Sequence, residues 1–459
     1  MNQDAALLPN GYRMTDLGPL PEEWRVVRLG DVFNPIPKRL RQVRVQSTKT
    51  YRMLTVRLYA KGVTLRAEQI GAKIGSRILF EAKAGDFVFS KIDARNGAWG
   101  FVPECLSGAL VSNDFPMLTL SSNLAEKDFV EFALSRPAVW IQLRGFAVGT
   151  TNRRRLQVPE FLKTPIPLPP LPEQRAIAHV LRTVQAAKEA GERVVEALRA
   201  LKKSLMRHLF TYGPVPIDAV EHVPLRDTEL GPLPAHWQVV RLGEVFEIQQ
   251  GKSLSPKSRS GPRMRPFLRT VNVLWGRIDL TSIDEMHFEE AEEDRLALKP
   301  GDLLVCEGGD IGRTAIWEGQ LPICLYQNHL HRLRARGENT LPTFYMYWMQ
   351  HAWTFLGIYS GAGNKTTIPN LSRSRLSSFL IPLPPLAEQR EIARILQAVD
   401  RRIQAEEAHV HALEALFRTL LHELMTARRR LPAEFIAKFA SHGDQTLRAA
   451  TPTIEERSL

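Results

Sequence analysis

The sequence predicts an α+β fold in which two homologous mixed α/β domains are joined by two long helices that form an antiparallel coiled coil, with a pseudo-twofold internal repeat. Three observations carry this prediction. A proline-rich stretch that leads into a helix occurs twice, and a tryptophan-containing stretch that precedes it also occurs twice. Each long helix then carries apolar residues at heptad spacing.

The two proline-rich stretches, here called the straps, are Ile166–Leu181 and Ile381–Leu396, and twelve of their sixteen positions are identical. Proline fixes φ and lacks an N–H donor, so the first residues of each strap should be extended. Glu173 and Glu388 then fall in the first turn of a helix, where negative charge favours the helix dipole. Each strap therefore directs the start of a helix.

The two tryptophan-containing stretches, here called the Trp motifs, are Leu17–Phe33 and Leu230–Phe246, with thirteen of seventeen positions identical. Their spacing of 213 residues differs by only two from the 215-residue spacing of the straps. The whole half is therefore duplicated, which indicates two homologous domains and not a solenoid of short repeats.

Between each Trp motif and its strap lies a body, Asn34–Pro165 in the first half and Glu247–Leu380 in the second, and the two are similar in length and mostly dissimilar in sequence. The resulting organisation is a first domain at 1–165, a first strap and long helix at 166–212, a linker and second domain at 213–380, a second strap and helix at 381–430, and a partly disordered tail at 431–459. Each body should combine short strands with one helix. The strands are expected at 51–58, 86–90, 268–273 and 302–306, the helices at 124–135 and 341–356, and a short helix in the tail at 433–440.

The long helices should pair through their apolar seams, because duplicated seams that follow nearly identical straps are natural pseudo-twofold partners. The middle of the second helix is more polar, with Arg402 and Glu406 at positions equivalent to the seam. The pairing residues predicted from the heptad count are Ile177, Val180, Val184, Val194, Leu198, Leu201, Leu205, Ile392, Ile395, Val399, Val410, Leu413, Leu416, Leu420 and Leu424.

The composition indicates a basic, cytoplasmic protein. The net charge is +12, and the excess is scattered among polar and Gly/Pro-rich segments, which is consistent with a polyanionic partner. We find no apolar run of membrane-spanning length and no signal peptide. The three cysteines form no CxxC pair, which argues against a disulfide framework or a zinc site.

Motifs for catalysis are not found. Gly251-Lys252-Ser253 resembles the end of a phosphate-binding loop, but Phe246 stands where the loop requires its first glycine. Asn34-Pro35-Ile36-Pro37 lacks the second proline and the aromatic residue of the amino-methyltransferase motif. The chain is therefore predicted to be non-catalytic, with no metal site.

Taken together, the doubled Glu-Gln-Arg straps, the Leu-Gly-Pro-Leu-Pro-x-x-Trp motifs and the heptad helices resemble the DNA-specificity subunit of type I restriction-modification enzymes. The resemblance covers roughly Leu17 to Arg430. It implies two target-recognition domains that each read one half of a bipartite DNA sequence, and a coiled coil that sets the gap. It also implies double-stranded DNA, DNA methyltransferase subunits (two of them) and restriction motor-nuclease subunits as partners. S-adenosylmethionine, ATP and Mg²⁺ would be bound by those partners, with no cofactor on this chain.

Phosphate contacts are expected from scattered arginines and lysines, and base contacts from a few Arg, Asn, Gln, Thr and Lys side chains in body loops. In Lys91–Gly97 a glycine turn presents cationic and amide groups together. The candidates in the first body are Arg39, Arg41, Arg44, Lys91, Arg95, Asn96, Arg153, Arg154 and Arg155. Those in the second are Lys252, Lys257, Arg259, Arg263, Arg265, Asn328, His329, Asn364, Lys365 and Thr366.

Four alternatives stay open at this point. The chain could be a coiled-coil scaffold without specific DNA readout, or a self-contained methyltransferase-nuclease whose motifs have drifted. Within the resembled family, it could serve a methylation-only system or a fused nuclease-methylase.

Overall fold

The computed structural model describes residues 8–146, 155–357 and 371–440. The chain divides into two compact units, one made of residues 1–191 and 409–459 and the other of residues 192–408. Two long helices, α5 (Leu171–Tyr212) and α10 (Leu386–Met425), each begin in one unit and end in the other. With 42 and 40 residues, they are about 60 Å long at 1.5 Å per residue. The predicted fold class, two mixed α/β halves with two long packed helices, is confirmed.

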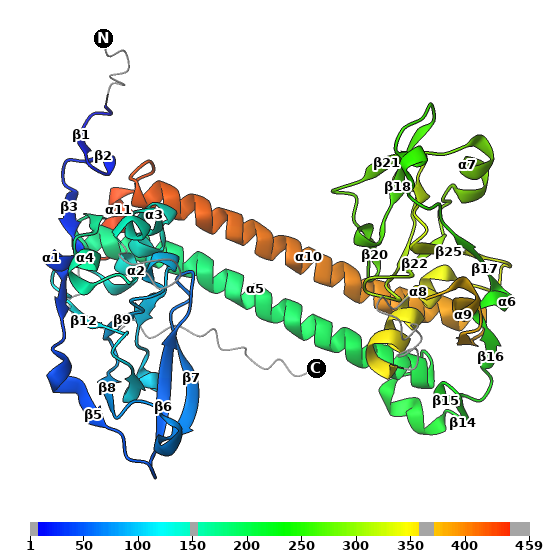
Figure 1. The fold of residues 1–459 in the computed structure, drawn as a ribbon, viewed down its shortest axis with the longest axis horizontal. Coiled ribbons are helices and arrows are strands. Elements are labelled where there is room, and N and C mark those ends of the chain that lie inside the picture. Colours follow the sequence, from blue (N-terminus) through cyan, green and yellow to red (C-terminus); the bar gives the residue numbers. More distant parts are fainter. Residues whose placement is uncertain (1–7, 147–154, 358–370, 441–459) are drawn as a thin grey trace. The chain divides into compact units, whose positions relative to one another are not determined.

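The body of the first unit is built on two sheets, with strand orders β10-β9-β12-β4 and β5-β8-β11-β6-β7 (Figure 1). In the second sheet β6 pairs antiparallel with β7 and parallel with β11. The elements of this unit are β1 (Tyr12–Thr15), β2 (Gly18–Pro21), β3 (Arg25–Arg28), α1 (Leu29–Val32), β4 (Phe33–Pro35), η1 (Lys38–Arg41), β5 (Gln42–Arg44), β6 (Thr50–Val56), β7 (Val63–Ile70), η2 (Gly71–Lys73), β8 (Ile78–Ala82), β9 (Phe87–Phe89), η3 (Ala94–Asn96), β10 (Trp99–Phe101), η4 (Glu104–Leu106), β11 (Ala109–Val111), β12 (Met117–Leu120), α2 (Lys127–Ser135), α3 (Pro137–Phe146), α4 (Val158–Leu162), β13 (Pro165–Leu168), the start of α5, the end of α10, and α11 (Ala433–Ala437).

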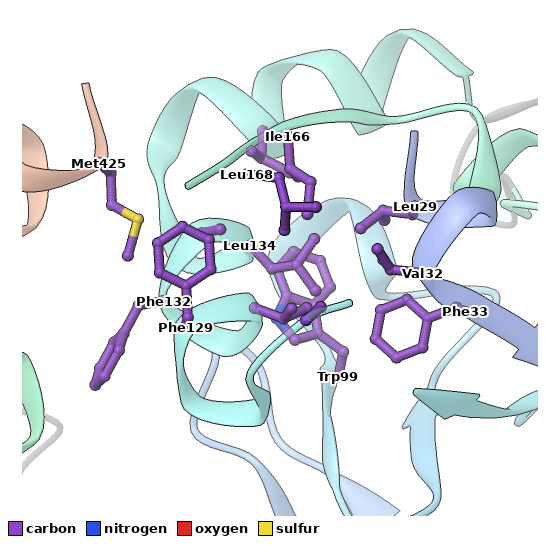
Figure 2. Packing of buried hydrophobic residues seen from close by; sticks show 14 of the residues in the cluster. Leu29, Val32, Phe33, Trp99, Phe129, Phe132, Leu134, Ile166, Leu168 and Met425 are labelled. Atoms are coloured by element: carbon purple, nitrogen blue, oxygen red, sulfur yellow. The ribbon is translucent and has the colours of Figure 1, made fainter. Parts of the chain in front are cut away.

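Buried aromatic residues from β10, α2 and the first Trp motif form the main core of this unit (Figure 2). Trp99 and Phe129 are fully buried in it, and Met425 reaches it from the end of α10, beside Phe129. Met425 is fully buried, so the second long helix contributes to the core of the first unit.

The second unit has the same plan, with sheets β17-β25-β22-β23 and β21-β18-β24 (Figure 1). Its core receives Phe210 from the end of α5, which contacts Phe344 and Trp348 edge to face. The elements are η6 (Ile217–His222), β14 (Leu225–Thr228), β15 (Gly231–Pro234), β16 (Gln238–Arg241), α6 (Leu242–Val245), β17 (Phe246–Gln250), η7 (Pro256–Arg259), β18 (Met264–Leu268), η8 (Thr270–Asn272), β19 (Val273–Leu274), β20 (Arg277–Ile278), β21 (Asp284–His287), α7 (Glu290–Leu296), β22 (Leu303–Cys306), β23 (Thr314–Ile316), β24 (Leu325–Tyr326), β25 (Leu330–Ala335), α8 (Pro342–His351), a π-helical turn (Ala352–Leu356), α9 (Arg373–Ser377), β26 (Leu380–Leu383), the end of α5 and the start of α10.

One predicted strand is wrong. The segment 268–273 was expected to be extended, but β18 ends at Leu268 and the chain then forms the 3-10 turn η8. Asn272 explains the turn, because its buried amide accepts from the Arg269 N–H at 2.8 Å and donates to the carbonyls of Asp279 and Ser282. These bonds fix a turn where β-branched neighbours suggested a strand.

Candidate nucleic-acid interface and the frame that carries it

In the first unit, Glu173 of the strap holds the Trp motif in place. Its carboxylate accepts a hydrogen bond from Trp24 Nε1 at 2.9 Å and an ion pair from Arg430 Nε at 2.8 Å. Arg430 follows α10, and it also contacts Glu23 at 2.9 Å. Burial of Trp24 and Glu173 makes this a structural lock between the Trp motif, the strap and the end of the second long helix.

The neighbouring strap residue, Gln174, fastens the body helix α2. Its Oε1 accepts from the N–H of Glu126, the N-cap of α2, at 2.8 Å. Its Nε2 donates to the carbonyls of Leu124 and Pro169 at 3.1 and 2.8 Å. A fully buried amide that satisfies three backbone groups fixes where the body begins its helix.

The second unit repeats both devices. Glu388 accepts from Trp237 Nε1 at 2.9 Å, and Gln389 bonds the N–H of Leu341 and the carbonyls of Asn339 and Pro384. The strands of strap and Trp motif also pair in both units, β13 with β3 and β26 with β16. The doubled Glu-Gln pair therefore faces inward and positions each body on its helix.

The long helices pack antiparallel within each unit. In the second unit Arg199 pairs with Glu407 at 2.6 Å and Lys202 with Asp400 at 2.7 Å, so partner numbers fall on α10 as they rise on α5. In the first unit a Cβ added to Gly191 would lie 2.8 Å from the Val410 side chain. Glycine therefore permits a close approach of the two helices at this point.

The heptad register needs a correction in α5. Val194 and Leu201 leave 40% and 48% of their surface exposed, whereas Val195 leaves 7% and the side chain of Lys202 13%. The packed face therefore runs through Gly191, Val195 and Lys202. Counting apolar residues favoured Leu201 because a lysine is an unlikely seam residue until its partner Asp400 is known.

In α10 the same shift occurs at Leu416, which is 45% exposed while Phe417 packs on Phe132 with ring centroids 5.8 Å apart. In the polar middle, Arg402 is largely exposed and pairs with Glu406, and Ile403 is buried. The other predicted seam residues are buried or half-buried: Ile177, Val180, Val184, Leu198, Leu205, Ile392, Ile395, Val399, Val410, Leu413, Leu420 and Leu424.

Several predicted DNA contacts of the first body are exposed cations. Arg39 and Arg44 are exposed at η1 and β5, and Arg155 is exposed with an ion pair to Asp114 at 3.2 Å. Arg41, in contrast, is only 16% exposed in its side chain and contacts Asp86 at 3.4 Å. Arg41 therefore makes a contact within the protein and is a weaker candidate for a DNA contact.

The predicted turn Lys91–Gly97 contains η3, with Lys91, Arg95 and Asn96 half-buried. The structure brings this turn against the loop 57–62 that connects β6 and β7, because the N–H of Tyr59 donates to the Asn96 carbonyl at 2.8 Å. Sequence reasoning missed this loop. Its cations, Arg57 and Lys61, flank an aromatic residue, a combination that was a usable signal.

Three predicted contacts of the second body are engaged by the acidic helix α7. Lys252 pairs with Glu292 and donates to the His287 carbonyl at 2.9 Å. Arg265 pairs with Glu293 at 3.0 Å, and Arg263 contacts Glu290 and Glu293 at 3.5 and 3.7 Å. Lys257, Arg259 and His329 are exposed, and Asn328 is half-buried.

Five candidates, Arg153, Arg154, Asn364, Lys365 and Thr366, lie outside the described residues. Within the described ranges, no group of three or more His, Cys, Asp or Glu side chains is placed to hold a metal ion. In that same part of the chain, no helix combines the length and apolar character needed to cross a bilayer.

Comparison with known proteins identifies the duplicated plan. Residues 21–196 and 234–415 match the family described as type I restriction modification DNA specificity domain. The type I restriction enzyme MjaVIII specificity subunit of Methanocaldococcus jannaschii is 24% identical over 424 residues, which is 90% of this chain and 94% of that protein.

Two solved structures share the fold. The S subunit of a type I restriction-modification system from M. genitalium superposes with a TM-score of 0.56 at 16% identity, over 91% of this chain and 97% of that one. A chain from a structure of complex assembly and conformational transition of the type I R-M system has a TM-score of 0.51 at 22% identity, over 89% and 99% of the two chains.

Proposed function

The chain belongs to the type I restriction modification DNA specificity family, and from this premise we propose that its two bodies read the two halves of one bipartite, asymmetric DNA target. As a member of that family it is the specificity subunit, with two specificity domains, and a non-catalytic part of a type I restriction-modification complex. The proposal concerns how it reads DNA and what it assembles with.

One observation carries the proposal. The frame, meaning the Trp motif, the strap and the long helix, is the same in both units, whereas the bodies differ. The Trp–Glu bond is 2.9 Å in each unit, and each strap glutamine caps its body helix in the same way. Bodies that are held identically but differ in sequence and loops are suited to reading different DNA sequences. The exposed cations Arg39, Arg44, Lys257 and Arg259 then supply phosphate contacts.

Membership in the specificity family also suggests which partners the chain assembles with. Two DNA methyltransferase subunits dock on the duplicated frame and modify adenine, and restriction motor-nuclease subunits join them. S-adenosylmethionine, ATP and Mg²⁺ are bound by these partners. The complex works in the cytoplasm, where the free thiols of Cys105, Cys306 and Cys324 stay reduced.

A body exchange tests the proposal. The segment 34–165 is replaced by the corresponding body of another family member, and methylated adenines are mapped genome-wide in cells with the parent chain, the exchanged chain or neither. We expect methylation that depends on the chain, at a bipartite sequence of which only one half changes. A change in both halves contradicts modular reading.

A coiled-coil scaffold without DNA readout makes a different prediction. The purified chain with its methyltransferase partners would then show no preference for the mapped sequence over a scrambled duplex. Specific binding that weakens steeply with salt excludes the scaffold.

A further inference from the structure

The tip of the β6–β7 hairpin is strained. Tyr59 and Ala60 have φ of 62° and 54°, and both are non-glycine residues in the left-handed region. L-residues avoid this region because Cβ crowds the backbone, and a tyrosine there is uncommon. Such strain persists where the surrounding structure enforces it, and it concentrates at functional sites.

The surrounding structure does enforce this conformation. Two backbone hydrogen bonds of 2.8 Å, from the N–H of Tyr59 to the Asn96 carbonyl and from the N–H of Ala60 to the Gly97 carbonyl, fix the tip on the Lys91–Gly97 turn. Gly97 makes the contact possible, since a Cβ there would lie 2.8 Å from the Trp140 ring and 3.0 Å from the Ala60 nitrogen. The tip is thus held rigidly by backbone contacts.

A second close approach fixes the base of the loop. A Cβ on Gly100 of β10 would lie 2.8 Å from the Gly62 Cα, so the hairpin rests directly on the strand that follows the turn. The N–H of Arg57 also donates to the Gly62 carbonyl at 2.9 Å and closes the loop. The loop is therefore a preorganised platform, which lowers the entropy cost of binding.

The platform presents an aromatic ring between two cations. Tyr59 leaves 60% of its surface exposed, although its ring centroid lies 6.2 Å from that of Trp140. Arg57 and Lys61 are exposed, and no ion pair to either is found in the part of the chain that the structure describes. Between residues 57 and 67 the sequence holds no acidic residue.

We propose that Tyr59 contacts DNA in the half-site read by the first body, with its ring against base edges in a groove and Arg57 and Lys61 on the flanking phosphates. This inference rests on the proposed function and names a residue for it. Aromatic rings make apolar contacts with base edges such as the thymine methyl group, and cations beside them bind the phosphate backbone. The charge favours DNA over a protein partner as the occupant.

Three substitutions in the full chain, purified with its methyltransferase subunits, test the proposal. Tyr59→Gly removes the ring and also relieves the positive φ, so we expect the thermal midpoint to hold or rise while affinity for the mapped target falls roughly 5- to 100-fold. Ala60→Gly is the matched control: it relieves the same strain and keeps the ring, so affinity should stay within about twofold. Tyr59→Phe keeps the aromatic ring and should also stay near the parent.

The readouts are duplex affinity, base-pair discrimination in each half-site and thermal midpoint. Support requires that Tyr59→Gly loses discrimination in the first half-site alone, with methyltransferase association unchanged. Unchanged affinity overturns the proposal, as does a fall in both midpoint and affinity, which identifies a structural tyrosine. Loss of methyltransferase association identifies a protein contact instead. If the parent complex itself does not discriminate its target from a scrambled duplex, the proposed function fails and this inference fails with it.

Discussion

The two strap glutamates have the same neighbours in sequence but different side-chain partners in space. Glu173 is neutralised by Arg430, a residue 257 positions later in the chain, whereas Glu388 is paired with His236 of its own Trp motif at 2.7 Å. His236 stands at the position that Glu23 occupies in the Trp motif of the first unit. The first lock therefore depends on the returning end of α10, and the second is local.

The contact between a long helix and the body helix also differs between the two units, although it is made at equivalent positions. In the first unit Phe417 packs on Phe132, and in the second Lys202 lies over the ring of Tyr347, 5.1 Å from its centroid, and pairs with Asp400. Lys202 and Tyr347 each stand 215 positions from their counterparts, Phe417 and Phe132. The two units therefore keep this contact between long helix and body helix at equivalent positions. The contact is apolar in the first unit and polar in the second.

The largest difference between the units should appear when Arg430 or His236, the second partner of each strap glutamate, is removed. Arg430→Met leaves the buried Glu173 carboxylate with Trp24 alone and should cost about 2–3 kcal/mol, below the full penalty for a buried pair because Arg430 is one-third exposed. His236→Ala removes a half-exposed partner and should cost less than about 1 kcal/mol. Hydrogen exchange at β3 and β16 measures each lock locally, and equal losses would contradict the comparison.

Acid should affect the second unit more than the first. Burial, with a smaller contribution from Arg207, lowers the pKa of His351 to about 4 from its ordinary 6.5. The unfolded chain therefore binds this proton first, so the stability contributed by neutral His351 is present above pH 6.5 and is lost as pH falls towards 4. At pH 5 the loss is about 2 kcal/mol.

The matched variant is His351→Phe, which keeps a ring among Phe210, Trp348 and Phe355. Its hydrogen exchange in α8 should change much less than that of the parent between pH 6.5 and 5, after correction for the intrinsic rate. The change that remains comes from His331 of the same unit, whose pKa is also lowered by burial. The equivalent position in the first unit is Arg136, which stays charged throughout this range. A parallel loss at α2 would show that His351 is not the cause.

The smallest effect is expected at the polar contact of the second unit, which is formed by Lys202, Tyr347 and Asp400. Lys202→Met leaves Asp400 with only the Tyr347 hydroxyl, at 2.7 Å, and should cost about 1–2 kcal/mol in denaturant unfolding. Transplanting the first unit's residues, Lys202→Phe with Tyr347→Phe and Asp400→Gln, should recover most of that loss. If the triple variant is less stable than Lys202→Met, the apolar contact of the first unit cannot replace the polar contact of the second.

Local sequence predicted the repeat, the long helices and some of the short elements, among them β6, β9, β22, α2 and α8, because each depends on neighbours along the chain. Most of the short strands were not predicted, and each described body holds three α-helices where one was expected. It could not predict the packed face at Lys202 and Val195, since the choice over Leu201 and Val194 depends on Asp400, 198 positions from Lys202. The same limit explains the predicted DNA contacts. In the sequence Lys252 and Arg265 look like free cations, because their ion pairs form only when α7 packs against them. The positive φ of Tyr59 likewise depends on tertiary contacts of its loop.

The antiparallel helices, we propose, set the gap between the two half-sequences that the bodies read. Because Gly191 of α5 faces Val410 of α10, a heptad must be added to both helices, after Gly191 and before Val410, to keep their pairing. Seven residues add about 10 Å, or about three base pairs of B-DNA.

Mapping the methylated adenines of this double-insertion variant tests the role of the helices directly. We predict a target whose two half-sequences are unchanged and whose gap is longer by about three base pairs. An active variant with the parental gap would contradict a helix-defined gap.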